Sequence, residues 1–128
     1  MAAKQVLIML KMPNGQRTGK YCAQAAHASM GALFSIGNIV DNKMVIPLDN
    51  EFVREWVTGQ FKKIALSVDN TADLQSVFAQ ARALGLPCAL IEDSGLTEYN
   101  GVPTLTAVGI GPGDASLIDR ITGNLKLF

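Results

Sequence analysis

Three polar residues share one face of a segment that is otherwise small and apolar. Lys20, Gln24 and His27 are spaced at i, i+4 and i+7, so on a helix their side chains form one stripe. The residues between them are mostly Ala and Cys, which let a helix lie close against a sheet. A lysine in the first turn opposes the positive end of the helix dipole, and this favours a functional explanation. The segment is typical of an anion site.

Lys20 and the free amide groups at the start of its helix are suited to hold a phosphate or a developing oxyanion. The preceding Gly19 permits close approach of a ligand to the backbone. The spacing is not that of a Walker loop, because Tyr21 stands where a hydroxyl would meet magnesium. The alternative is a surface lysine that happens to begin a helix.

A carboxylate and a hydroxyl stand four positions apart at Asp93 and Thr97. Asp93 is suited to orient or deprotonate a water molecule, and Thr97 to align it or donate to a substrate oxygen. The alternative is that Asp93-Ser94-Gly95 only makes a turn held by side-chain-to-backbone hydrogen bonds.

The remaining reactive side chains argue against a metal or redox site. His27 is the only histidine, which excludes a multi-histidine metal site, and we expect neither a metal nor a cofactor. His27 either orients Gln24 or a substrate group, or is a hydrogen-bonded packing residue. We expect Cys22 to be a buried small residue. Cys22 and Cys88 are too few for a disulfide framework, which favours a cytoplasmic protein.

Composition predicts one folded domain spanning residues 1–128. Hydrophobic residues make up 48% and charged residues 17%, which excludes a disordered chain, and no apolar run is long enough for a membrane helix. The net charge of zero argues against a general nucleic-acid binder, and we expect neither DNA nor a membrane as a partner. Residues 1–43 nevertheless hold five basic side chains and one acidic one. They present either a local positive face or a chance segregation of solvated charges.

Hydrophobic periodicity and capping residues predict four strands and four helices. The strands are expected at residues 6–10, 63–68, 88–91 and 105–110. The helices are expected at about 20–36, 50–59, 70–84 and 115–123, with Asn50, Asn70 and Asp114 as N-caps. Residues 38–48 are expected to form a loop.

This order predicts an α/β domain of three layers, with helices on both faces of a four-stranded mixed sheet. The first three strands are joined through helices, so right-handed crossovers should make them parallel, and the fourth should be antiparallel. Ligands gather beyond the carboxyl ends of parallel strands. The loops at residues 14–20 and 93–100 then open on the same edge, which brings Lys20 and Asp93 within reach of one another.

Four patches, taken together, resemble the type 2 peptidyl-tRNA hydrolases, the archaeal and eukaryotic kind. The similarity covers nearly the whole chain. The patches are Gly19-Lys20 with Ala23-Gln24 and His27-Ala28, Gly59-Gln60 before Lys62-Lys63-Ile64, Asp93-x-Gly95-x-Thr97, and Gly111-Pro112 with Asp119-x-Ile121-Thr122-Gly123-x-Leu125-Lys126-Leu127.

The resemblance implies metal-independent cytosolic hydrolysis of the ester that joins a peptide to the 3′ ribose of tRNA, usually by a homodimer. It implies that Lys20 holds the negative charge of the tetrahedral intermediate or of a nearby phosphate. Asp93 and Thr97 would place the attacking water. The supporting or substrate-binding residues would be Arg17, Gly19, Gln24, His27 and Gly95.

The chain departs from the family pattern at three positions, where the family has two basic residues and a glutamine. The family's Gly-Lys-Gly-Lys is Arg17-Thr18-Gly19-Lys20 here, with Arg17 as a displaced substitute. The family's arginine before Thr97 is Leu96, and its following glutamine is Glu98. Fewer cations neutralise fewer phosphates, which weakens RNA binding. These departures favour an alternative, a divergent member without hydrolase activity that binds another ligand or a protein, whereas Lys20, Asp93 and Thr97 favour the enzyme.

Overall fold

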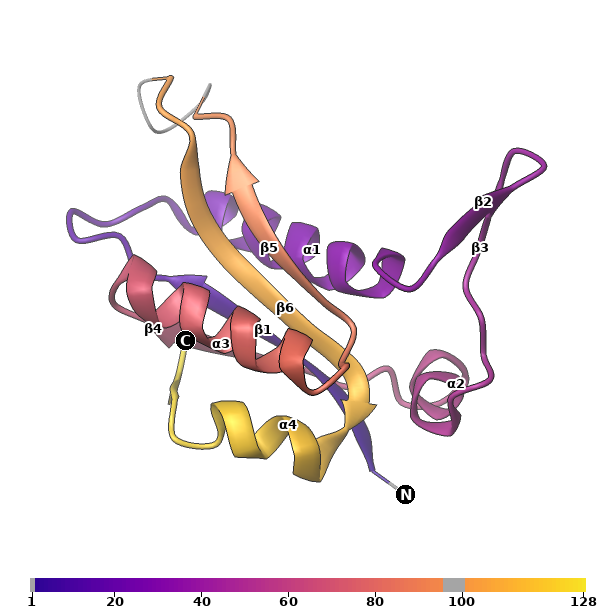
Figure 1. Cartoon of the computed structure of the whole chain (residues 1–128). Coiled ribbons are helices and arrows are strands. Elements are labelled where there is room, and N and C mark those ends of the chain that lie inside the picture. Colours follow the sequence, from indigo (N-terminus) through magenta and orange to yellow (C-terminus); the bar gives the residue numbers. More distant parts are fainter. Residues whose placement is uncertain (1, 96–100) are drawn as a thin grey trace.

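The fold is built around a strand, β1 (Ala3–Leu10), in which every residue after the first is buried. The unbroken apolar run from Val6 to Leu10 has this burial because other layers cover both faces of the strand. The computed structural model describes residues 2–95 and 101–128. In this part of the chain β1 is the middle strand of a five-stranded sheet with the order β5-β6-β1-β4-β7 (Figure 1).

The four predicted helices and the predicted strands near residues 63–68, 88–91 and 105–110 are present with shifted ends, and β2, β3 and β7 are additional. The remaining strands of the main sheet are β4 (Lys63–Val68), β5 (Cys88–Asp93), β6 (Thr104–Asp114) and β7 (Lys126–Leu127). The helices are α1 (Thr18–Phe34), α2 (Glu51–Thr58), α3 (Thr71–Ala83) and α4 (Ala115–Thr122). A separate hairpin pairs β2 (Asn38–Val40) with β3 (Lys43–Val45).

The predicted N-caps of three helices are confirmed. The Asn50 side chain accepts hydrogen bonds from the amides of Phe52 and Val53 at the start of α2. Asn70 and Asp114 accept in the same way at the starts of α3 and α4. Each cap satisfies backbone amides that have no partner within the helix.

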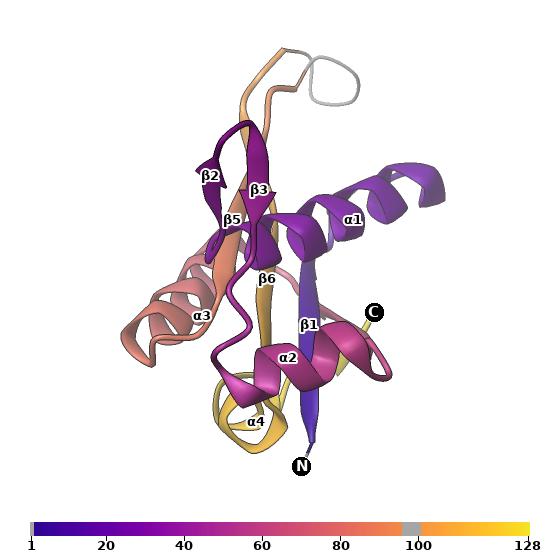
Figure 2. The same cartoon turned by 90° about the vertical axis from the view of Figure 1, so that its right-hand side faces the viewer.

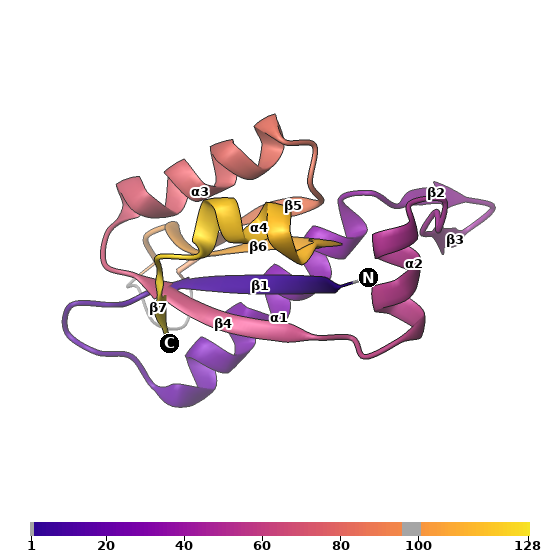
Figure 3. The same cartoon turned by 90° about the horizontal axis from the view of Figure 1, so that it is seen from below.

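Helices cover both faces of the sheet, so the predicted three layers are confirmed. Helices α3 and α4 lie on one face and α1 on the other (Figures 2 and 3). Alternation along β1 divides the core in two, because Val6, Ile8 and Leu10 pack with α3 and α4. Leu7 and Met9 face the opposite way and pack with α1. Helix α2 packs against β1 and β6.

The expected sheet of four strands, three of them parallel, is wrong in its strand number and its pairing. Among the described strands, only β1 and β4 pair in parallel, whereas β6 pairs antiparallel with both β1 and β5. Strand β5 therefore runs in the same direction as β1, but β6 is inserted between them. The additional strand, β7, pairs antiparallel with β4.

The expected loop at residues 38–48 is also wrong, because it contains the β2–β3 hairpin. Asp41 and Asn42 form its turn with positive φ angles of 51° and 60°. Asn and Asp tolerate this conformation, which a two-residue hairpin turn requires. The hairpin projects away from the sheet beyond the end of α1 (Figure 1).

Helix α1 lies close against the sheet, as its small residues predict. A Cβ at Gly109 of β6 would stand 2.1 Å from the carbonyl oxygen of Ala28, and one at Gly31 would stand 3.1 Å from the Ala89 Cβ. Glycine at these positions lets the backbones approach. Among the described helices, none has both the length and the apolar character that crossing a membrane requires.

Candidate active site

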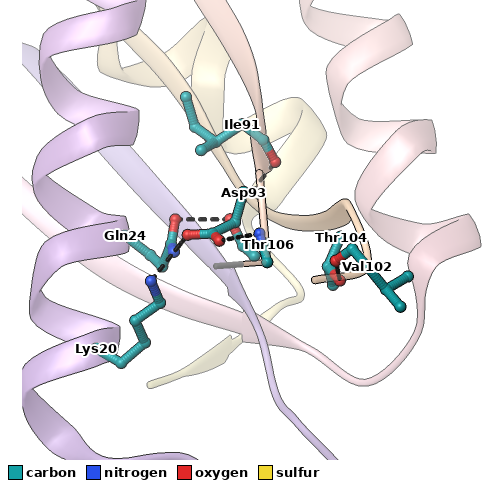
Figure 4. Close-up of polar contacts among 8 residues, drawn as sticks. Lys20, Gln24, Ile91, Asp93, Val102, Thr104 and Thr106 are labelled. Atoms are coloured by element: carbon teal, nitrogen blue, oxygen red, sulfur yellow. Dashed lines mark hydrogen bonds and ion pairs between the residues drawn. The ribbon is translucent and has the colours of Figure 1, made fainter. Parts of the chain in front are cut away.

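The structure brings Lys20 and Asp93 together. This agrees with the prediction that their two loops open on the same edge of the sheet. The Lys20 Nζ lies 2.9 Å from Asp93 Oδ2 (Figure 4). The two side chains are 15% and 11% exposed, so the ion pair is largely shielded from solvent but can be reached. Lys20 comes from the first turns of α1 and Asp93 from the carboxyl end of β5. Because β5 and β1 run in the same direction, these two ends meet at one edge of the sheet.

Gln24 joins the same carboxylate oxygen from the next turn of α1. Its Nε2 donates to Asp93 Oδ2 over 2.8 Å, and its side chain is buried, with 1% of the residue exposed. The i, i+4 spacing of Lys20 and Gln24 places both donors above the end of β5 (Figure 4).

The other carboxylate oxygen of Asp93 holds the turn that follows β5. The amide of Gly95 donates to Asp93 Oδ1 over 2.7 Å. Gly95 has a φ of 83°, and a Cβ there would stand 2.3 Å from the Val102 carbonyl oxygen, so only glycine fits. The turn and the ion pair, which the sequence leaves as alternatives, are both present because each uses a different oxygen.

These donors fix the charge of Asp93. The hydrogen bond from Lys20, followed by those from the Gly95 amide and Gln24, lowers the pKa of the carboxyl from 3.8 to about 2, against the opposing effect of burial. Asp93 is therefore fully ionised at neutral pH.

A buried threonine on β6, which the sequence did not reveal, holds Gln24 in place. The Thr106 hydroxyl donates to Gln24 Oε1 over 2.7 Å, and the Thr106 Oγ1 also lies 3.5 Å from the Ile91 carbonyl oxygen. With its carbonyl anchored, the Gln24 amide can only present its nitrogen to Asp93. Thr106 is 2% exposed and lies behind the ion pair (Figure 4).

An irregularity in strand pairing aims Thr106 at α1. Ala107 pairs with Ile91 and Leu105 with Glu92, so Thr106 is an extra residue on β6 between two consecutive residues of β5. Such a bulge breaks the alternation of side chains. Leu105 packs on the α3 side and Ala107 on the α1 side, and Thr106 also turns to the α1 side. The one available signal was a hydroxyl within an otherwise apolar strand.

The other predicted site residues have different positions. Arg17 is exposed at the N-cap of α1, where its backbone oxygen accepts from the amides of Lys20 and Tyr21. Gly19 is exposed, and a Cβ there would meet nothing within 4 Å, so the fold itself does not require glycine. Thr97, like Leu96 and Glu98, lies outside the described residues.

His27 and Cys22 are both exposed on α1. Within the described residues the structure does not bring His27 to the Lys20–Asp93 pair by a hydrogen bond or ion pair. The expectation that Cys22 is buried is wrong, because the apolar contacts of α1 fall on Ala25, Ala28 and Tyr21 instead. Across residues 2–95 and 101–128, no three His, Cys, Asp or Glu side chains are grouped to hold a metal ion.

Comparison with known proteins finds one family over almost the whole chain. Residues 3–128 match the family model described as "Peptidyl-tRNA hydrolase PTH2". The chain is 41% identical over 128 residues to a protein named peptidyl-tRNA hydrolase from Staphylothermus marinus, covering 98% of this chain and 94% of that one. It is 38% identical over 122 residues to the protein of the same name from Aeropyrum pernix, covering 94% and 93%. A protein named probable peptidyl-tRNA hydrolase 2 from Schizosaccharomyces pombe is 35% identical, with 97% and 56% covered.

Proposed function

The chain belongs to the peptidyl-tRNA hydrolase PTH2 family, and on this premise we propose that the Lys20–Asp93 pair is where it hydrolyses its substrate. The protein is a peptidyl-tRNA hydrolase, which releases tRNA from peptidyl-tRNA. The bond broken is a carboxylic ester between the peptide and the ribose. Since this substrate arises in translation, we place the protein in the cytoplasm.

Asp93 orients the attacking water and stabilises the charge that develops on it. A carboxylate with a pKa of about 2 takes up a proton poorly at neutral pH, so it is a weak general base. It is a strong hydrogen-bond acceptor, and a water molecule bound to it would be held with its lone pair available for attack. The low pKa thus favours positioning over deprotonation as the role of this residue.

Lys20 stabilises the oxyanion of the tetrahedral intermediate. Its ammonium group is held within 2.9 Å of Asp93, so it is already desolvated and directed before substrate arrives. A fixed cation in a partly shielded site needs little reorganisation when the carbonyl oxygen becomes negative, and such preorganisation is the source of much enzymatic rate enhancement.

Three further residues position this pair. Gly95 and Gln24 each donate to Asp93, and Thr106 anchors Gln24.

We assign Thr97 to the alignment of the water, and Arg17 to a phosphate of the tRNA, on their places in the sequence. Gly19 gives the substrate access to the backbone at the start of α1, and its open surroundings support this role. His27, being exposed, is assigned to contact with substrate.

The observation that carries the proposal is the convergence of Lys20 and Gln24 on one oxygen of Asp93. The test is to add the protein to N-blocked aminoacyl-tRNA at low salt and to follow the release of free tRNA. We expect turnover without added metal. Failure of the wild-type protein to release tRNA, under conditions in which it binds tRNA, would instead support the divergent binding protein.

We infer that the protein acts as a homodimer from exposed apolar side chains at the end of α1 and on both faces of the β2–β3 hairpin. This hairpin patch consists of Met30, Phe34, Ile39, Val40, Met44 and Val45, which lie at the end of α1 and on the β2–β3 hairpin. A two-stranded hairpin that stands alone is marginally stable in water. Apolar side chains gathered on such an element mark an interaction surface, and a second copy of the chain is the occupant we propose.

A further inference from the structure

A second group of side chains beside the start of α1 has no part in the mechanism above. The rings of Tyr21 and Phe128 meet edge to face, with their centroids 4.8 Å apart and their planes at 63°. The Lys11 ammonium lies over the Phe128 ring, 5.1 Å from its centroid. The group joins three distant parts of the chain, namely the residue after β1, the first turns of α1 and the residue after β7.

Backbone and side-chain hydrogen bonds hold each member of the group. The Phe128 amide donates to the Ala65 carbonyl oxygen on β4, and the Lys11 amide donates to that of Val68. The Tyr21 hydroxyl accepts a hydrogen bond from the Met12 amide over 3.0 Å. These bonds hold the Tyr21 ring and the Phe128 backbone in place, which lowers the conformational entropy that the protein loses when a ligand stacks on the pair.

The two rings differ in their accessibility. Tyr21 packs against the core residues under α1 and serves as the support. Phe128 is 46% exposed, a large value for a ring held this firmly, and Lys11 is exposed beside it. An aromatic face with a cation next to it is the combination that binds single-stranded RNA, because the base stacks and the cation neutralises a phosphate.

The group adjoins the site through consecutive residues of one helix. Tyr21 follows Lys20 directly, so the support of the aromatic pair and the ammonium of the site begin from adjacent Cα atoms about 3.8 Å apart. The first turns of α1 thus direct Lys20 toward β5 and Tyr21 toward β7. Since β5 and β7 are the two edge strands of the sheet, an RNA strand whose last ribose lies at Lys20 would cross the start of α1 to place a preceding base on Phe128.

We propose that Phe128 is a stacking platform for a base in the single-stranded 3′ end of the tRNA, and that Lys11 neutralises a neighbouring phosphate. The proposal rests on the proposed function, since it names how that site holds its substrate. It also accounts for how binding is kept although basic residues of the family pattern are missing here.

The chain provides a matched control at the far end of the sheet. The Lys63 ammonium lies over the ring of Phe61, 3.2 Å from its centroid, and Phe61 is 50% exposed. This second pair stands at the start of β4, next to the start of β1, whereas Lys11 follows the end of β1. Phe61 thus offers the same chemistry, an exposed ring under a lysine, but away from the Lys20–Asp93 pair.

The first experiment measures kcat and KM on N-blocked aminoacyl-tRNA for Phe128→Leu, Phe128→Tyr and Phe61→Leu. Leucine keeps an apolar contact with Tyr21 but removes the flat ring, so we expect KM to rise about fivefold or more with kcat unchanged. Phe128→Tyr keeps an aromatic ring and should have the wild-type KM, and so should Phe61→Leu. In Lys11→Ala the slope of log KM against log salt concentration should decrease by the amount that corresponds to about one phosphate contact.

The second experiment reads stacking directly and needs no turnover. The indole introduced by Phe128→Trp should lose fluorescence when a short single-stranded RNA ending in CCA is added. The wild-type protein, whose single Trp56 is buried, should show no such loss.

The outcomes separate the two proposals. If the wild-type enzyme releases tRNA but Phe128→Leu has an unchanged KM and the introduced indole does not respond to RNA, the stacking platform is wrong and the proposed function stands. If the wild-type enzyme releases no tRNA, the proposed function is wrong, and the fluorescence titration alone decides for or against the platform.

Discussion

At the scale of single residues, the site is an ionised carboxylate surrounded by donors. Asp93 accepts from Lys20 and Gln24 at one oxygen and from the Gly95 amide at the other. The contact of Lys20 with Asp93 could be predicted, because both residues follow from local spacing and the direction of two strands. Thr106 could not, because its role depends on a bulge that no local pattern reveals.

The low pKa of Asp93 makes the stability of the protein depend on pH. The carboxyl titrates at about 2 in the folded protein, against an ordinary value of 3.8. Its ionised form therefore stabilises the fold fully above pH 3.8, and this contribution is lost as the pH falls toward 2. The measurement is the free energy of unfolding of the wild type and of Asp93→Asn from about pH 6 to about pH 2. We expect the difference between them to shrink on acidification, and a constant difference would contradict the assigned pKa.

The Thr106 hydroxyl is expected to act on catalysis through Gln24. In Thr106→Val the buried Gln24 Oε1 loses its donor, at a cost of about 1–3 kcal/mol, and the amide is free to turn away from Asp93. We expect kcat to fall by about 10- to 100-fold and the pKa of Asp93 to rise. Thr106→Ser keeps the donor and should restore both quantities. Loss of stability in Thr106→Val without a change in kcat or in the Asp93 titration by NMR would mean that the hydroxyl is only structural.

At the scale of elements, helix α1 and the bulge in β6 set the geometry of the site. The periodicity and caps predict all four helices, because these signals lie within each segment. The hairpin and β7 were missed for different reasons. The hairpin strands have three residues each and are exposed, so they lack a pattern of alternating burial. β7 has two residues and exists only because the edge of β4 is available to it.

The close approach of α1 to β6 is expected to control both stability and activity. In Gly109→Ala the new methyl group would collide with the Ala28 carbonyl oxygen, and α1 must move outward. We expect a loss of about 1–3 kcal/mol in the free energy of unfolding and a lower kcat, because Gln24 moves away from Thr106 and Asp93. Gly19→Ala is the control for stability, since its methyl group meets nothing. Wild-type stability in Gly109→Ala would show that α1 and β6 accommodate the added methyl group and would contradict this prediction.

At the scale of the whole molecule, the sheet brings the functional residues to one edge although its strand number and pairing differ from the expected ones. The insertion of β6 between β5 and β1 leaves these two strands running in the same direction, as expected. Strand order depends on long-range pairing, which local sequence does not specify. The hairpin patch lies at the end of α1, and Lys20 lies at the start of the same helix. A dimer formed through the patch therefore leaves the start of α1 open to substrate.

The proposed dimer is tested by placing a charge in the hairpin patch. Ile39 is 77% exposed, so Ile39→Lys should leave the monomer folded but prevent burial of the patch in an interface. Sedimentation velocity should give a dimer for the wild type and a monomer for the variant. Val57→Lys, which changes an exposed residue of α2 outside the patch, should remain a dimer. A wild-type protein that sediments as a monomer would contradict the proposal.

The role proposed for the Lys20 ammonium, held against Asp93, is to stabilise the transition state of ester hydrolysis. It is tested most directly by the rate of tRNA release from N-blocked aminoacyl-tRNA by Lys20→Ala and by Lys62→Ala, a change of an exposed lysine beyond the far end of the sheet. We predict that Lys20→Ala loses about 100-fold or more in kcat and remains folded, with a lower melting temperature because Asp93 loses its ion-pair partner, while Lys62→Ala retains the wild-type rate. A wild-type rate in Lys20→Ala would contradict the account.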